Sequence, residues 1–206
     1  ARTVQSTERR DVDLRQLLRT ATVAHCHWYN PRANPRRRNA TPLDVRVTIA
    51  GHDIVWPMPR DQVQSLTALY PGTPVLLPSN IVDFRDAPLD DSILREILAP
   101  LQPQPHACTY ELVHLAIDIV GNSSAIVPSS PPPNTFGTLV YFFPSDCTGG
   151  AITISYGSDQ LIVAAPSNGD YMALYNTATV SVAPIDAGHR IVAVYHLMYT
   201  EGRPTL

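Results

Sequence analysis

The second half of the chain is dominated by short runs in which apolar residues alternate with polar ones or follow one another directly. Several such runs, bounded by Gly, Pro, Asn, Asp and Ser, are typical of the strands of a β-sandwich or barrel. We expect one long strand at residues 109–120. Further strands are expected at residues 136–143, 151–156, 159–165, 170–176, 179–185 and 189–199.

The segment FGTLVYFFPSDCTGGAITISYG, residues 136–157, contains two of these apolar runs on either side of a polar stretch. That stretch, residues 144–150, ends in two glycines. Glycine pairs between apolar runs are common in β-hairpins. The pattern therefore predicts that strands 136–143 and 151–156 form one hairpin.

Residues 45–105 are predicted to form a lead-in of mixed structure, in which a strand at 45–51 pairs with 52–58. Two helices are expected after it, at 59–70 and at 89–101. The first begins with Pro and has an acidic residue in its first turn, both of which favour a helix start. Its apolar residues fall on one face and are Val63, Leu66 and Leu69.

Residues 1–44 have no sustained pattern, and we expect an irregular N-terminal arm with one amphipathic helix at 11–22. The remaining residues, 45–206, are predicted to be one domain, with the lead-in at 45–105 and a β core at 106–200. The chain has 206 residues, of which 44% are hydrophobic, so it is large enough to bury a core of this kind.

Composition narrows the classes of function. The formal net charge is −3, and no apolar run approaches the about 20 residues that cross a bilayer, so neither nucleic acid nor a membrane is expected as a partner. The cluster Arg36, Arg37 and Arg38 is short and lacks interleaved aromatic residues, so we interpret it as a solvated loop. All fifteen basic residues are arginine, which excludes a Schiff-base lysine. Three widely spaced cysteines leave the compartment undetermined.

Two stretches, FGTLVYFFPSDCTGG and YMALYNTATVSVAPIDAGHRIVAVYHL, resemble a fungal, oomycete and bacterial group of the 2-oxoglutarate/iron(II) dioxygenase superfamily. This group is akin to the prolyl 4-hydroxylase catalytic domain. The resemblance runs from about residue 45 to residue 197 and is most specific at 136–139, 144–150 and 188–190. It implies an α+β fold, in which a double-stranded β-helix, or jelly roll, is supported by a few helices.

The resemblance also implies where iron would bind. The family uses two histidines and one carboxylate, which leave open positions on the metal. The His-x-Asp positions fall on Ile126 and Pro128, and the distal His position falls on Val180, so none of the three ligands is present. The whole connection at 119–135 contains no His, Asp or Glu. The basic residue that pairs with the far carboxylate of 2-oxoglutarate in the family falls on Arg190.

Arg190 can therefore be interpreted in two ways. It could bind a small molecule that carries a carboxylate, because guanidinium geometry suits carboxylates. Alternatively, it pairs with a carboxylate or carbonyls of the protein itself and serves only the structure. We favour the structural interpretation, since a dicarboxylate without a metal loses its second anchor.

The faces of the last two strands predict that the cavity is partly filled. Val180 and Val182 share one face of their strand. In the last strand a shared face is formed by Arg190, Val192, Val194 and His196. If both faces point inward, aliphatic groups occupy the volume where the family holds iron.

Other candidates for metal binding or catalysis have less support in the sequence. The clusters His25-Cys26-His27 and His106/Cys108 each lack a second cluster at a suitable spacing, so we interpret them as ordinary residues. His114 and Asp118 share one face of a strand and predict an ion pair or a solvent-facing polar stripe. Cys147 lies in the polar turn without an identifiable base, so we interpret it as an ordinary turn residue.

Together these patterns favour a non-catalytic oxygenase-like jelly roll with a structural or protein-interaction role, including a coat or virion-associated role, and with no metal or cofactor. A protein partner or a homo-oligomer is expected. One alternative is an active iron(II)/2-oxoglutarate hydroxylase with ligands from other positions. Another is a carboxylate-binding module that uses Arg190.

Overall fold

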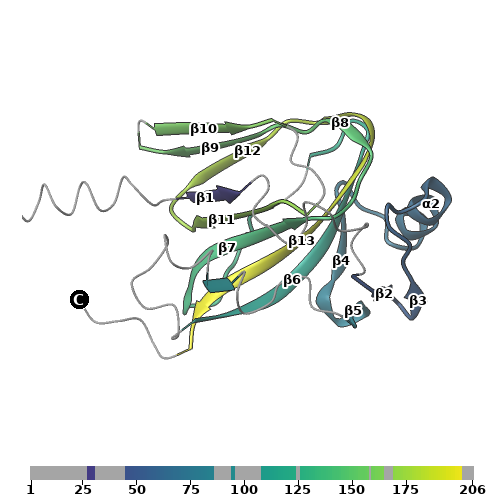
Figure 1. Cartoon of the computed structure of the whole chain (residues 1–206), viewed down its shortest axis with the longest axis horizontal. Coiled ribbons are helices and arrows are strands. Elements are labelled where there is room, and N and C mark those ends of the chain that lie inside the picture. Colours follow the sequence, from purple (N-terminus) through teal and green to yellow (C-terminus); the bar gives the residue numbers. More distant parts are fainter. Residues whose placement is uncertain are drawn as a thin grey trace, which may run out of the picture.

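Two antiparallel sheets lie over one another and form the centre of the molecule (Figure 1). The computed structural model describes residues 27–30, 45–85, 94–95, 108–123, 126–157, 159–164 and 169–200. The predicted helix at 11–22 and the arginine cluster at 36–38 lie outside these residues. So does most of the predicted helix at 89–101, of which only Leu94 and Arg95 are described, both helical.

The larger sheet brings together strands that are distant in the sequence. Its order is β1 (His27–Asn30), β11 (Tyr171–Tyr175), β7 (Thr135–Phe142), β13 (Ile185–Tyr199), β6 (Cys108–Ile119) and β4 (Val75–Pro78). The short strand β8 (Cys147–Gly149) pairs with the first residues of β13. The smaller sheet has the order β10 (Asp159–Val163), β9 (Ile152–Tyr156) and β12 (Thr179–Val182). Two antiparallel sheets with these crossed connections form the predicted jelly roll, and its class is α+β.

The inner strands β7, β11 and β13 are buried on both faces over most of their length, which explains their continuous apolar sequences. Residues 191–198 of β13 are all buried. One face packs against the smaller sheet, and the other packs against the lead-in, so the domain has two apolar cores separated by the larger sheet. The predicted strands are all present and differ from the prediction only at their ends, whereas β1, β4, β5 (Val82–Phe84) and β8 were not predicted.

The lead-in covers the outer face of the larger sheet. Its small sheet has the order β3 (His52–Asp53), β2 (Val47–Ile49) and β5 (Val82–Phe84), so the predicted pairing of 45–51 with 52–58 is confirmed in shorter form. A short 3₁₀ helix, η2 (Ser79–Ile81), precedes β5.

The helix α2 (Arg60–Leu69) confirms the helix predicted at 59–70 and lies at one side of the molecule (Figure 1). Val63 and Leu66 are buried as expected. Leu69, the third apolar residue of the predicted face, is 65% exposed near the end of the helix. Within the described part of the chain, no helix is long and apolar enough to cross a bilayer.

The predicted hairpin between 136–143 and 151–156 is wrong. β7 pairs with β11 and β13 in the larger sheet, whereas β9 pairs with β10 and β12 in the smaller one. The intervening residues carry the chain from one sheet to the other, and β8 pairs with β13 on the way. Gly149 and Gly150 both have positive φ, 79° and 69°, so the glycine pair forms a corner between sheets.

Candidate functional site

The space between the two sheets is filled with apolar side chains. On β13, Val192 and Val194 are fully buried there, as the predicted strand face required. Val180 and Val182 on β12 are half-buried and pack against the same core. The other buried residues of this core are Ala116, Ile126, Val140, Phe142, Ile152, Ile154, Val163, Met172, Leu174 and Ala178.

The positions implied for the iron ligands belong to this core or lie at its edge. Ile126 is 1% exposed within the core, and Val180 is paired with Ile154 on β9. Pro128 is half-buried. Side chains made only of carbon and hydrogen offer no lone pair to a metal, so these three residues do not fit an iron site.

The buried side chain of Arg190 donates three hydrogen bonds between the sheets. Its side chain is 2% exposed, and that of Asp118 is 0% exposed. The Nε and Nη2 atoms of Arg190 donate to Oδ2 of Asp118 at 3.1 and 2.9 Å. Nη1 donates to the carbonyl oxygen of Gly150 at 2.5 Å. The guanidinium is thus bound on two sides by groups of the protein. One is a carboxylate and the other a backbone carbonyl, which are the two kinds of partner named in the structural interpretation of Arg190.

The corner after β8 brings the Gly150 carbonyl to Arg190. A Cβ atom at Gly150 would lie 2.7 Å from Nη1 of Arg190 and 2.6 Å from Cδ1 of Ile185, so only glycine fits this approach. The Ser145 hydroxyl holds the start of the corner, because it donates to the Phe143 carbonyl at 2.9 Å and accepts from the Ile191 amide at 3.1 Å. The corner therefore fixes both the position and the conformation of β13 next to Arg190.

Asp118 was missed as the partner of Arg190. The sequence showed that it shares a strand face with His114, and both side chains are buried, so the solvent-facing interpretation is wrong. A signal did exist, since an acidic residue in a long apolar strand needs a buried cation. The sequence does not give the register between β6 and β13, which places residue 118 beside residue 190.

Histidines lie further along the same strands. His196 is 7% exposed, its Nδ1 has no hydrogen-bond partner among the described residues, and burial lowers its pKa against the opposing effect of Glu111. His114 is 8% exposed. In the described ranges, no group of three or more His, Cys, Asp or Glu side chains could hold a metal ion.

Among the remaining candidates, the structure adds no catalytic feature to Cys147. His25, Cys26 and His106 lie outside the described residues. Cys147 is half-buried in β8, and burial raises the pKa of its thiol more than Arg190 lowers it. Since the thiolate is the reactive form of cysteine, this environment does not activate Cys147.

Several solved structures share similarity with this chain. The first is a 2OG-Fe(II) oxygenase family oxidoreductase from Burkholderia pseudomallei, with a TM-score of 0.44 and 14% identity over 70% of this chain and 81% of that one. A Pseudomonas putida prolyl-4-hydroxylase has a TM-score of 0.44 and 12% identity over 87% of this chain and 96% of that one. A Trichoplax adhaerens prolyl hydroxylase, in complex with a hypoxia inducible factor peptide fragment, has a TM-score of 0.38 and 12% identity over 90% and 76%.

No protein-family model matches the sequence, and no curated protein is similar enough to count as a relative. Structural similarities with TM-scores below 0.5 carry no argument about activity. The chemistry between the sheets must therefore be judged from the residues of this chain.

Proposed function

We propose that this chain is a non-catalytic jelly-roll module that serves a structural or protein-interaction role. The observation that carries the proposal is the buried contact of Arg190 with Asp118 and with the carbonyl of Gly150. The edge of the guanidinium formed by Nε and Nη2 is already bound to a carboxylate of the same chain, so a ligand carboxylate cannot use that edge. The aliphatic side chains beside it leave a metal without ligands at the positions implied by the family.

The physical cost of this arrangement also favours a structural role. Removing a guanidinium and a carboxylate from water costs several kcal/mol for each ion, and only close contacts offset that cost. The two bonds to Asp118 and the third to Gly150 provide such contacts. The polar groups of the site are therefore used to hold β6, β13 and the corner together.

Metal analysis and turnover measurements test the proposal against the enzyme alternative. The purified full chain is loaded anaerobically with iron(II), and one portion is desalted and assayed for bound iron. A second portion is mixed with iron(II) and 2-oxoglutarate in air-saturated buffer, since succinate formation consumes oxygen, and is assayed for succinate release. We expect iron far below one ion per chain and no succinate above the protein-free control. Stoichiometric iron with 2-oxoglutarate turnover would reject the proposal and support ligands from other positions.

A thermal shift titration tests the carboxylate-binding alternative. A small molecule that binds the folded state raises the free energy of unfolding by RT ln(1 + [L]/Kd). We expect millimolar 2-oxoglutarate and succinate to leave the melting temperature unchanged relative to a chloride control of equal ionic strength. An increase that grows with the logarithm of ligand concentration and that Arg190→Met removes would assign Arg190 to ligand binding.

The role in assembly is tested by the mass of the particle in solution. Jelly rolls build shells and surface structures as well as enzymes, so the fold alone does not distinguish the roles. Light scattering after size exclusion over a hundredfold range of concentration measures self-association directly. A mass above that of one chain supports the homo-oligomer, whereas a monomer at all concentrations restricts the role to binding a different partner.

A further inference from the structure

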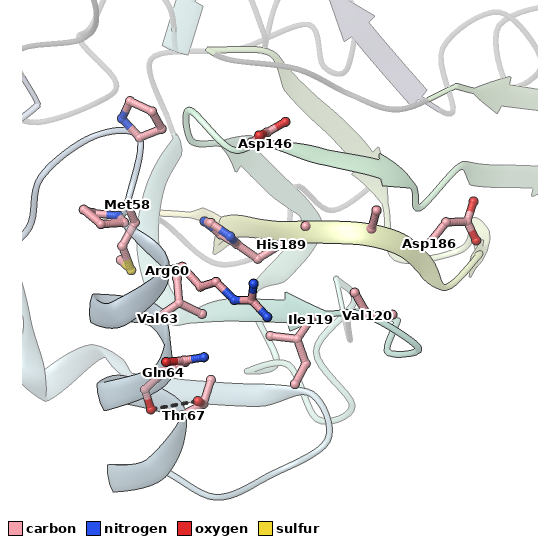
Figure 2. Close-up of a pocket in the computed structure, with 14 residues that line it drawn as sticks. Met58, Arg60, Val63, Gln64, Thr67, Ile119, Val120, Asp146, Asp186 and His189 are labelled. Carbon is pink, nitrogen blue, oxygen red and sulfur yellow. Dashed lines mark hydrogen bonds between the residues drawn. The ribbon is translucent and has the colours of Figure 1, made fainter.

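A groove of about 830 Å³ lies between helix α2 and the end of the larger sheet (Figure 2). One wall is a single face of α2, formed by residues at helical spacing. The opposite wall comes from the end of β6, the turn before β8 and the first residues of β13. The lining residues used below are Arg60, Ile119, Val120, Asp146, Asp186 and His189.

The floor of the groove is apolar and open to solvent. Ile119 is 36% exposed and Val120 is 58% exposed, at the point where β6 ends. The buried side chains of Val63 and Met58 continue this surface toward α2. Concave surfaces of this size with an apolar floor and a few polar groups are the usual form of binding sites.

Charged side chains that form no ion pair with the described residues surround this floor. In Figure 2 the guanidinium of Arg60 lies between His189 and Ile119, while Asp186 lies further along β13. Arg60 makes no ion pair or hydrogen bond with any described residue. The carboxylates of Asp146 and Asp186 likewise have no ion-pair partner in the described part of the chain. The groove thus presents one cation and two anions around exposed aliphatic groups.

His189 adds a neutral hydrogen-bonding group. Its Nε2 is shielded from solvent and has no hydrogen-bond partner among the described residues. Burial lowers the pKa of His189, and Asp146 and a backbone hydrogen bond at Met58 oppose this effect. The imidazole lies on the opposite face of β13 from Arg190, so the groove is separate from the ion pair between the sheets.

We propose that this groove binds an extended peptide segment of a protein partner, in which an apolar side chain lies between an acidic and a basic one. The acidic side chain would pair with Arg60, the apolar one would cover Ile119 and Val120, and the basic one would pair with Asp186. Alternate side chains of an extended peptide point the same way about 7 Å apart, so one short segment offers all three groups. This proposal rests on the protein-interaction role proposed above in one respect: it takes the ligand to be part of a protein.

Five acetylated and amidated pentapeptides of defined charge are the probes. Two carry both charges in opposite order, Glu-Ala-Leu-Ala-Arg and Arg-Ala-Leu-Ala-Glu, since the direction of binding is open. The others are Glu-Ala-Leu-Ala-Glu, Arg-Ala-Leu-Ala-Arg and Gln-Ala-Leu-Ala-Gln, and in all five the three side chains that the proposal uses alternate with alanine and so share one face. Binding to the full chain is followed by amide chemical shifts in two-dimensional NMR titrations.

We expect one of the two mixed-charge peptides to bind most tightly and to shift the amides of Ile119, Val120 and His189. Arg60→Glu should weaken binding of that peptide by about fivefold to tenfold and should favour Arg-Ala-Leu-Ala-Arg instead. Asp186→Asn should weaken it by about twofold to fivefold. The matched controls Arg85→Glu and Asp83→Asn change exposed charges outside the groove lining and should leave binding unchanged.

The proposal fails if none of the peptides shifts the groove amides at millimolar concentration. It also fails if the neutral peptide binds as tightly as the mixed-charge ones, or if Arg60→Glu leaves the order of affinities unchanged. Iron-dependent turnover in the assay above would reject the non-catalytic role without altering the outcome of this titration.

Discussion

Arg190 and Asp118 lie directly opposite each other on the neighbouring antiparallel strands β13 and β6, and their side chains meet between the two sheets. The pair joins residues 72 positions apart in the sequence. Because Arg190 also binds the Gly150 carbonyl, one buried guanidinium connects the central strands of the larger sheet to the corner that leads into the smaller sheet.

Breaking this pair from one side should destabilise the fold strongly. Arg190→Met and Asp118→Val each leave one buried charge without its partner, so each is expected to cost about 3–5 kcal/mol of unfolding free energy. The double variant Arg190→Met/Asp118→Val removes both charges and should be more stable than either single variant. Urea unfolding of the four proteins measures the coupling. Additive costs would show that the two side chains do not act as a pair.

Truncating Asp118 should create a binding site for a small carboxylate. Asp118→Ala leaves the Arg190 guanidinium buried with only the Gly150 carbonyl bound, next to a gap of the size of the lost group. Formate or acetate that fills this gap should raise the stability of Asp118→Ala by about 1.4 kcal/mol at ten times its dissociation constant. Differential scanning fluorimetry with chloride as the salt control measures the effect. Arg190→Met/Asp118→Ala should not respond, and an equal response of the wild-type chain would contradict the prediction.

The sequence predicted the strands well because burial dictates their composition. The helix at 60–69 was also predictable from its proline start and its apolar spacing. The pairing of strands was not, because the same glycine pair can close a hairpin or turn a corner between sheets. Only the partners of each strand distinguish the two outcomes, and those partners are distant in the sequence.

Only a part of the candidate site could be predicted from the sequence. The inward face of β13, including Arg190, followed from strand alternation and from the family resemblance. Asp118 could not be assigned to Arg190, since the two residues are 72 positions apart and the pairing of β6 with β13 is not given by the sequence. The groove beside α2 was not predicted at all, because its two walls come from residues 57–67 and from segments that follow residue 118.

The corner glycine at position 150 should be less replaceable than a glycine with positive φ in open space. Gly150→Ala places a Cβ 2.7 Å from Nη1 of Arg190 and also strains a backbone with φ of 69°. Gly157→Ala is the matched control, because its φ is 58° and no atom lies within 4 Å of its added Cβ. We expect about 1–2 kcal/mol for the control, from backbone conformation alone. Chemical unfolding should show a larger loss for Gly150→Ala, and equal losses would mean that the contact with Arg190 imposes no steric limit.

Burial of His196 should make stability fall in mildly acidic solution. Its pKa is lowered in the folded chain, so below about pH 6.5, the usual value for histidine, the unfolded chain binds more protons than the folded one. Stability should therefore be fully present above that pH and be lost progressively as the pH falls toward the lower, folded-state pKa. His189 contributes in the same direction, since its pKa is also lowered.

His196→Gln cannot take up this proton, so its unfolding free energy should decrease less steeply below pH 6.5 than that of the wild-type chain. His52→Gln is the control, because His52 is exposed on β3 and its replacement should leave the slope unchanged. Urea unfolding at intervals from pH 7.5 to pH 5 measures all three slopes. A slope in His196→Gln equal to that of the wild-type chain would mean that the imidazole is protonated as readily between the sheets as in the unfolded chain.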